Sequence, residues 1–171
     1  MAMDYFELFE IPVQLKVPAG SLTQKFFELS RKYHPDYFVK DSDNAQATAL
    51  DKSAILNKAY RTFQNTDETI RYVLMQKGLM EEEEKYELPP AFLMEVLEIN
   101  EQLMDADDHA TNAAVRSTID NLQNEIYEPV KDIVEHYQEG ATTQEELLQV
   151  KEYYYKKKYL DRIRRQLAGM A

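Results

Sequence analysis

The sequence contains no cysteine, and glycine and proline are scarce, with 4 and 6 among its 171 residues. Without cysteine there can be no disulfides, no thiolate zinc sites and no cysteine-held iron–sulfur clusters. The low glycine and proline content favours helices over a turn-rich β fold. No apolar run approaches the roughly 20 residues that a membrane helix needs, and no secretory signal is visible. We therefore expect a helical, intracellular protein, with a 44% hydrophobic content that is enough to form a core.

Charge is distributed unevenly along the chain. Residues 1–78 carry ten basic and ten acidic side chains, residues 79–150 carry three and nineteen, and residues 151–171 carry seven and two. A body with net negative charge repels phosphate backbones, which argues against nucleic acid as a partner. The basic final stretch is expected to pack antiparallel to the acidic helices that precede it.

Two units are predicted, residues 1–78 and residues 91–171, joined by a linker at residues 79–90. The linker holds four consecutive glutamates at 81–84 followed by two prolines, which is typical of a solvated boundary between helical units. Residues 11–17 alternate like a strand, but their flanking prolines and the lack of a partner strand favour an extended connector.

The first unit is predicted to be an antiparallel hairpin of two long helices with short helices at either end. The first long helix is expected to begin at Ser21, with Gln24 completing a capping box, and to end at Pro35. Its apolar stripe consists of Leu22, Phe26, Leu29 and Tyr33. The second long helix is expected over 45–64, with an inward face made of Ala49, Ser53, Leu56, Tyr60 and Phe63. A short helix at 67–77 and a C-terminal Gly78 close the unit.

The second unit is predicted to be a three-helix bundle. Its helices are expected at about 90–104, 108–138 and 143–168. Pro129 should either kink the middle helix or split it. Gly140 is expected to end that helix, and Thr143 with Glu146 should cap the next one.

A His-Pro-Asp tripeptide opens the turn between the two long helices of the first unit. Alone, the tripeptide would indicate only the end of a helix. Its position between two amphipathic helices of matching length makes it a specific signal. Together with the segment Asp4–Phe9 and the segment Asn57–Tyr60, it makes the chain resemble the J domain of DnaJ-type co-chaperones, and within that group the HscB branch.

This resemblance implies a docking site for a partner and no catalytic site. In that family the His-Pro-Asp loop binds the ATPase domain of a DnaK-type (HscA-like) chaperone and stimulates ATP hydrolysis. The residues implied here are His34, Pro35 and Asp36 in the loop, with Lys25, Arg31 and Lys32 as basic contacts on the preceding helix. The chain departs from the common pattern at Tyr37, where many J domains have Lys or Arg, and this predicts slightly weaker docking. A catalytic His–Asp pair is disfavoured because no activated nucleophile accompanies it.

The helix at 90–104 has more apolar residues than one buried face requires. At about 100° per residue, one narrow stripe forms the core seam, with Leu93 and Leu97 around 120° away from it. That stripe consists of Phe92, Val96, Ile99 and Leu103. The pattern leaves two interpretations open, because Leu93 and Leu97 either pack against the third helix or form an exposed apolar patch rimmed by acids.

The resemblance favours the exposed patch, because the HscB family binds an iron–sulfur scaffold protein (IscU-like) through this helix and an aromatic residue of the last one. The client-binding residues it implies are Leu93, Met94, Leu97, Glu98, Glu101 and Tyr159. It implies an all-α, L-shaped adaptor without cofactor, metal or enzymatic activity. The alternatives are a J-domain co-chaperone for a different client and, from another class, a helical enzyme with carboxylate chemistry.

Three further features of the sequence are explained without assigning them a functional site. The Asp107-Asp108-His109 segment fits a solvated helix start better than a metal site, because adjacent acids do not share a helix face. Consecutive tyrosines at 153–155 point in different directions on a helix and favour packing over single-strand nucleic-acid binding. A cysteine-free chain lacking the N-terminal zinc module of animal relatives favours a bacterial cytoplasm.

Overall fold

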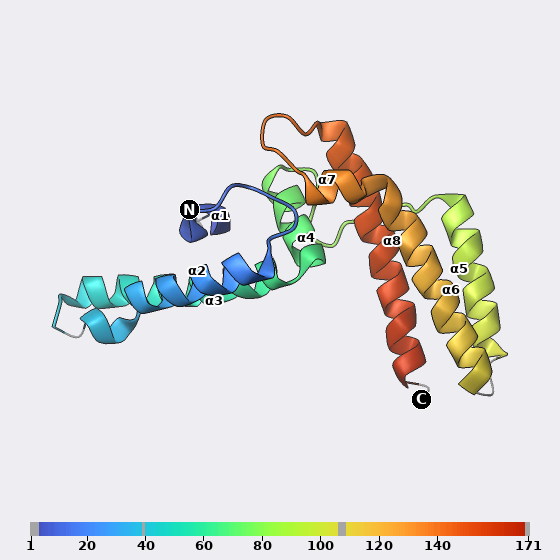
Figure 1. Ribbon diagram of the computed structural model, residues 1–171, viewed down its shortest axis with the longest axis horizontal. Helices are drawn as coiled ribbons and strands as arrows, with labels where there is room; N and C mark the ends of the chain where they lie inside the picture. Colours follow the sequence, from blue (N-terminus) through green and yellow to red (C-terminus); the bar gives the residue numbers. More distant parts are fainter. Residues whose placement is uncertain (1–3, 39, 106–108, 170–171) are drawn as a thin grey trace.

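The computed structural model describes residues 4–38, 40–105 and 109–169, and all regular structure in these ranges is helical. The elements form two arms that meet at a corner, so the molecule is L-shaped (Figure 1). One arm is the hairpin of α2 (Ala19–Lys32) and α3 (Asp43–Gln64), and the other is a bundle of α5 (Pro90–Met104), α6 (His109–Tyr127) and α8 (Gln144–Gly169). The all-α prediction is confirmed.

The chain begins with α1 (Tyr5–Phe9), the short helix predicted at the start of the first unit, for which the sequence analysis set no bounds. Asp4 caps it, because its carboxylate accepts hydrogen bonds from the backbone N–H groups of Phe6 at 2.7 Å and Glu7 at 3.4 Å. The connector that follows carries no regular structure, as expected. α1 supplies Phe6 and Phe9 to a core in which both rings contact Phe63 of α3.

The predicted N-cap of the first long helix, Ser21, is wrong by three residues. α2 begins at Ala19 after Pro18, and the hydroxyl of Ser21 donates to the carbonyl of Pro18 at 3.1 Å instead of capping N–H groups. Proline sets an extended geometry that precedes the first turn without a side-chain cap. α2 then ends at Lys32, and a 3₁₀ turn, η1 (Pro35–Phe38), leads towards α3.

The hairpin closes through packing and one long-range hydrogen bond. Ser53 on α3 donates from its hydroxyl to the carbonyl of Tyr33 at 2.9 Å, which ties the return helix to the end of α2. The predicted inward face of α3 is confirmed for Ala49, Leu56 and Phe63, which are buried. α4 (Thr66–Gln76) follows α3, and Gly78 adopts the left-handed conformation expected after a helix end.

Pro129 splits the middle helix of the second unit. α6 ends at Tyr127, and the chain continues as a 3₁₀ turn, η2 (Glu128–Val130), and a short helix, α7 (Lys131–Glu135). Proline lacks the N–H that would continue the helical ladder, so the direction of the chain changes there. The prediction that Gly140 ends this helix is wrong, because α7 stops at Glu135 and Gly140 lies in the turn before α8.

The last helix begins with the capping box that the sequence predicts. Thr143 accepts at its hydroxyl from the N–H of Glu146 at 3.1 Å, and its own N–H donates to the Glu146 carboxylate at 3.0 Å. α8 runs antiparallel to α6, and Arg164 pairs with Asp120 at 2.7 Å, as the charge distribution predicts.

Two hydrophobic cores hold the fold together, and the larger one crosses the corner. The smaller core joins α5, α6 and the second half of α8. The larger one combines α1 to α4 with Val130, Val134 and the first half of α8, including Tyr153 and Tyr154. Both tyrosines are buried, so the prediction that they pack is confirmed. The unit boundaries at 78/79 and 90/91 stay a prediction, because this core extends past them.

Ion pairs reinforce the same corner. Lys77 pairs with Glu139 at 2.7 Å, and Lys157 pairs with Asp67 at 2.5 Å. The linker is not wholly solvated as predicted, because Glu84 pairs with Lys151 of α8 at 2.8 Å while the three preceding glutamates are exposed. The linker is therefore fastened to the last helix.

Candidate functional site

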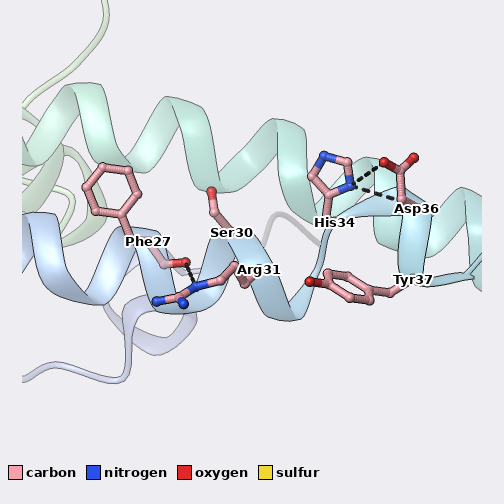
Figure 2. A pocket seen from close by; sticks show the side chains of 6 residues that line it. All are labelled: Phe27, Ser30, Arg31, His34, Asp36 and Tyr37. Carbon is pink, nitrogen blue, oxygen red and sulfur yellow. Dashed lines mark hydrogen bonds and ion pairs between the residues drawn. The ribbon is translucent and has the colours of Figure 1, made fainter.

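The tip of the hairpin carries an open pocket of about 750 Å³ (Figure 2). It lies where α2 ends and η1 begins, at the end of the arm farthest from the bundle (Figure 1). Its lining residues are Phe27, Ser30, Arg31, His34, Asp36 and Tyr37. The structure therefore brings together three of the six predicted chaperone-docking residues in one hollow.

The histidine and the aspartate of the loop are held against each other. The backbone N–H of Asp36 donates to Nδ1 of His34 at 3.2 Å, and the Asp36 carboxylate lies 3.5 Å from the same nitrogen. Because Nδ1 accepts this hydrogen bond, the neutral ring carries its proton on Nε2. Both side chains are exposed, so the Nε2–H donor and the carboxylate acceptor are available to a partner. The backbone of Pro35 begins the 3₁₀ turn that fixes this arrangement.

The three basic residues of α2 do not share one face. Arg31 lines the pocket, and its Nε donates back to the carbonyl of Phe27 at 3.4 Å. Lys25 and Lys32 lie roughly 120° and 100° away from Arg31 around the helix. Lys25 pairs with Glu10 at 2.9 Å, and this hydrogen bond raises the pKa of its ammonium group. Lys32 lies over the ring of Tyr33, 5.3 Å from its centroid.

Sequence reasoning missed Phe27, which is 58% exposed beside the loop. A signal was present, because Phe27 falls outside the apolar stripe of α2, and an aromatic residue on the polar side of a helix requires an explanation. Tyr37, noted only as a departure from a family pattern, is 68% exposed and makes an edge-to-face contact with His34.

A second exposed surface lies on α5, in the other arm. The core seam predicted for this helix is confirmed, since Phe92, Val96, Ile99 and Leu103 are buried. Leu93 and Leu97 are 43% and 51% exposed, so they do not pack against the third helix. The interpretation as an apolar patch is the one that the structure supports. Met94, Glu98 and Glu101 are also exposed and complete the predicted set on this helix.

Two further residues bear on the size of the apolar patch on α5, because one extends it and the other is less exposed than predicted. Met104, which the sequence analysis missed, is 85% exposed. It lies about 20° from Leu93 around the helix, in line with Leu93 and Leu97, so it extends their stripe by two turns. Tyr159 of α8 is only partly exposed, because its ring packs against the smaller core and under the guanidinium of Arg162 at 5.5 Å.

The described ranges hold no cluster of three or more His, Asp or Glu side chains that fits a metal ion. Asp107 and Asp108, in the segment that the sequence analysis considered as a metal site, lie outside the described residues. Of the helices that are described, none has the length and apolarity to cross a bilayer.

Comparison with known proteins identifies the family of the chain. Residues 88–168 match the family model of the HSCB C-terminal oligomerisation domain. A co-chaperone protein HscB homolog of Vibrio parahaemolyticus is 30% identical over 126 residues, which cover 73% of this chain and 74% of that protein. The chain belongs to the HscB family of co-chaperones. An HscB homolog of Photobacterium profundum is 35% identical over 62% of this chain, and the chain spans 63% of that relative's length.

Solved HscB structures share the whole architecture. Human co-chaperone protein HscB superposes with a TM-score of 0.79 at 27% identity, covering 98% of this chain and 81% of the human one. HscB of Vibrio cholerae gives a TM-score of 0.74 at 25% identity, covering 98% and 97% of the two chains. The relatives are named co-chaperones, a class of proteins that are not enzymes.

Proposed function

We propose that this HscB-family chain delivers an IscU-like iron–sulfur scaffold protein to an HscA-like, DnaK-type chaperone and stimulates the ATPase of that chaperone. The observation that carries the proposal is that His34 and Asp36 are exposed at the tip of one arm, while an exposed apolar patch lies on α5 in the other arm (Figure 1). Neither surface is needed to hold the fold, and each has the composition of a protein contact.

The loop is suited to recognition of a chaperone through hydrogen bonds. Asp36 orients the His34 ring through a 3.2 Å hydrogen bond to Nδ1, so Nε2–H projects as a donor without a further conformational search. Pro35 restricts the backbone of the loop, which lowers the entropy cost of docking. Arg31, in the same pocket, adds a positive charge for a carboxylate of the chaperone.

The α5 patch is suited to holding the scaffold. Leu93, Met94 and Leu97 offer apolar area, and Glu98 and Glu101 form an acidic rim, the usual anatomy of a protein interface. Tyr159 contributes the exposed part of its ring from α8. Holding the client on the same molecule that docks on the chaperone raises the client's effective concentration there.

The proposed role needs no cofactor and no metal, because ATP hydrolysis takes place on the chaperone. We place the protein in the cytoplasm of a bacterium, which matches its bacterial relatives. A co-chaperone for a different client would keep the docking loop and lose the assignment of the α5 patch.

The test is the steady-state ATPase rate of the cognate DnaK-type chaperone, with and without this protein and the purified scaffold. His34→Gln should abolish the stimulation, and Leu93→Ala/Leu97→Ala should remove only the scaffold-dependent part. His136→Gln is the matched control, because His136 is an exposed histidine beside an aspartate on α7's end, away from the hairpin tip.

Each outcome has a definite meaning. Stimulation that does not respond to the scaffold would leave a J-domain protein with another client. An inactive wild-type protein, with the chaperone shown to respond to another co-chaperone, would contradict the proposed function.

A further inference from the structure

We propose that Phe27 and Tyr37 are the two aromatic walls of a pocket that receives an apolar side chain of the DnaK-type chaperone, so that docking has a component that salt does not screen. This inference rests on the proposed function and deepens it. It concerns how the surface recognises the chaperone, beyond the hydrogen bonds and positive charges of the docking loop.

The geometry of the pocket supports an apolar occupant. Figure 2 shows Phe27 towards one end, Tyr37 with His34 towards the other, and Arg31 between them. The rings of Tyr37 and His34 meet edge to face with centroids 6.4 Å apart, which leaves a face of the tyrosine ring open. Most of the lining surface is apolar, and the hollow of about 750 Å³ has room for a large side chain.

The charges around the pocket argue against an ion as the occupant. Arg31 and Asp36 carry opposite charges at its rim, and no other residue that lines it is charged when His34 is neutral. The Arg31 side chain is drawn back towards the Phe27 carbonyl by its Nε hydrogen bond. The other predicted basic contacts, Lys25 and Lys32, do not line the pocket.

The two aromatic side chains gain little from the fold itself. Phe27 is 58% exposed, and its one ring contact among the described aromatic pairs is a tilted approach to Phe26 at 5.9 Å. Tyr37 is more exposed still. Large apolar surfaces left in solvent beside each other are typical of a binding site.

Continuity with the docking loop identifies the occupant. His34 and Asp36 line the same hollow as Phe27 and Tyr37, so a chaperone that contacts the loop also covers the pocket. Lys25 and Lys32 do not line the pocket, and Lys25 is already paired with Glu10. A hydrophobic contact in the pocket would therefore supply binding energy that these lysines do not. Tyr37, at a position where many J domains have Lys or Arg, then replaces an electrostatic contribution to binding with a hydrophobic one.

The test compares wild type with Phe27→Gln/Tyr37→Gln in chaperone ATPase assays at about 0.01 M and about 0.15 M salt, between which the Debye length falls from about 30 Å to about 8 Å. The variant should need about tenfold more protein for half-maximal stimulation. It should also lose stimulation more steeply with salt, since polar contacts then dominate. Leu50→Gln is the control, because Leu50 is equally exposed on α3 and does not line the pocket.

The outcomes separate this inference from the proposed function. Wild-type stimulation that His34→Gln abolishes, with the aromatic variant unchanged in half-maximal concentration and salt dependence, would overturn the inference alone. No stimulation by wild type would overturn both. Sedimentation of the protein alone provides a further check, because self-association lost only in the aromatic variant would make a second copy the occupant and overturn the inference. Both side chains are exposed, so an unchanged circular dichroism melting curve should confirm that the variant folds.

Discussion

At the scale of single residues, the corner of the molecule is rich in tyrosines whose ionisation is opposed by burial. Burial raises the pKa of Tyr155 to about 12, with the negative charge of Glu84 adding to the effect. Burial likewise raises the pKa of Tyr127 to about 12, helped by Glu135. Burial also raises the pKa of Tyr153, more strongly than for either of these.

These shifts predict a loss of stability at alkaline pH. In the unfolded chain these tyrosines lose protons near pH 10, whereas in the folded chain they keep them, so the folded state binds more protons between pH 10 and about 12. The stabilisation is complete below pH 10 and is lost as the pH rises to about 12. Urea midpoints should fall over this interval, and tyrosinate absorbance should show a group that ionises only with unfolding. A midpoint that stays constant up to pH 12 would contradict the prediction.

The exposure of single side chains was the property that the sequence predicted least well. The sequence placed Leu93 and Leu97 correctly around α5 but could not decide between packing and exposure, because that depends on how far the third helix lies from them. Phe27 was overlooked because the helical period was used only to identify the buried stripe, although an aromatic residue outside that stripe was a signal in the sequence.

At the scale of elements, the capping box of α8 gives a direct test of local helix stability. Thr143→Ala removes the acceptor for the Glu146 N–H and should lower the free energy of unfolding by about 1 kcal/mol, measured by urea denaturation. Thr118→Ala is the control, because Thr118 is exposed in the middle of α6 and bonds only back to the carbonyl of Ala114. Equal losses in both variants would mean that the cap has no special role.

The apolar stripe of α5 makes a prediction about the reach of the client surface. Met104→Ala should weaken binding of the scaffold by about threefold to tenfold, because it truncates an exposed side chain in line with Leu93 and Leu97. Gln102→Ala, on the opposite side of the helix, should leave affinity unchanged. Titration of the scaffold into both variants by calorimetry measures this. An unaltered affinity of Met104→Ala would end the surface at Glu101.

Local signals decided which element boundaries were predictable. Thr143 and Glu146 supply both halves of a reciprocal cap, so the start of α8 was predicted correctly. The same pattern at Ser21 misled, because Pro18 had already set the first turn. The short helix α1 was expected at the start of the first unit, but its bounds could not be predicted, because its stability comes from ring contacts with α3 and α4 and not from its own periodicity.

At the scale of the whole molecule, Lys157 joins the two arms. It contacts Asp67 of α4 and Asp161 of its own helix, with its side chain 18% exposed. Burial opposes its charge, but the hydrogen bond and charge of Asp67 outweigh burial, so its pKa is raised. The fold thus keeps this ammonium group protonated at neutral pH.

Lys157→Ala should lower the free energy of unfolding by about 1–3 kcal/mol, because Asp67 and Asp161 are left without their cation. Lys158→Ala, an exposed neighbour, serves as the control. The measurement is chemical denaturation followed by circular dichroism. A loss as large in Lys158→Ala would show that the bridge across the corner is not the cause.

The shared core also predicts that both arms unfold together. Val130, Val134 and Tyr153 belong to the same hydrophobic cluster as Phe6 and Ile70, and α8 continues from this cluster into the smaller core, so one helix takes part in the packing of both arms. Calorimetry should show one transition with equal calorimetric and van 't Hoff enthalpies. Two resolved transitions would contradict this. This coupling could not be predicted from the sequence, because the pattern of each helix reports only that a face is buried and not which arm buries it.

The turn at Pro129 has a consequence for how the two proposed partners would meet. Because the chain changes direction there, α7 packs into the core of the first arm, and side chains of both arms fill the corner. Packing of this kind restrains the angle between the arms, and with it the spacing of two proteins bound at their ends. If the proposed function holds, substitutions that loosen the corner should leave both affinities intact and still misalign the client, a defect visible only when all three proteins are present.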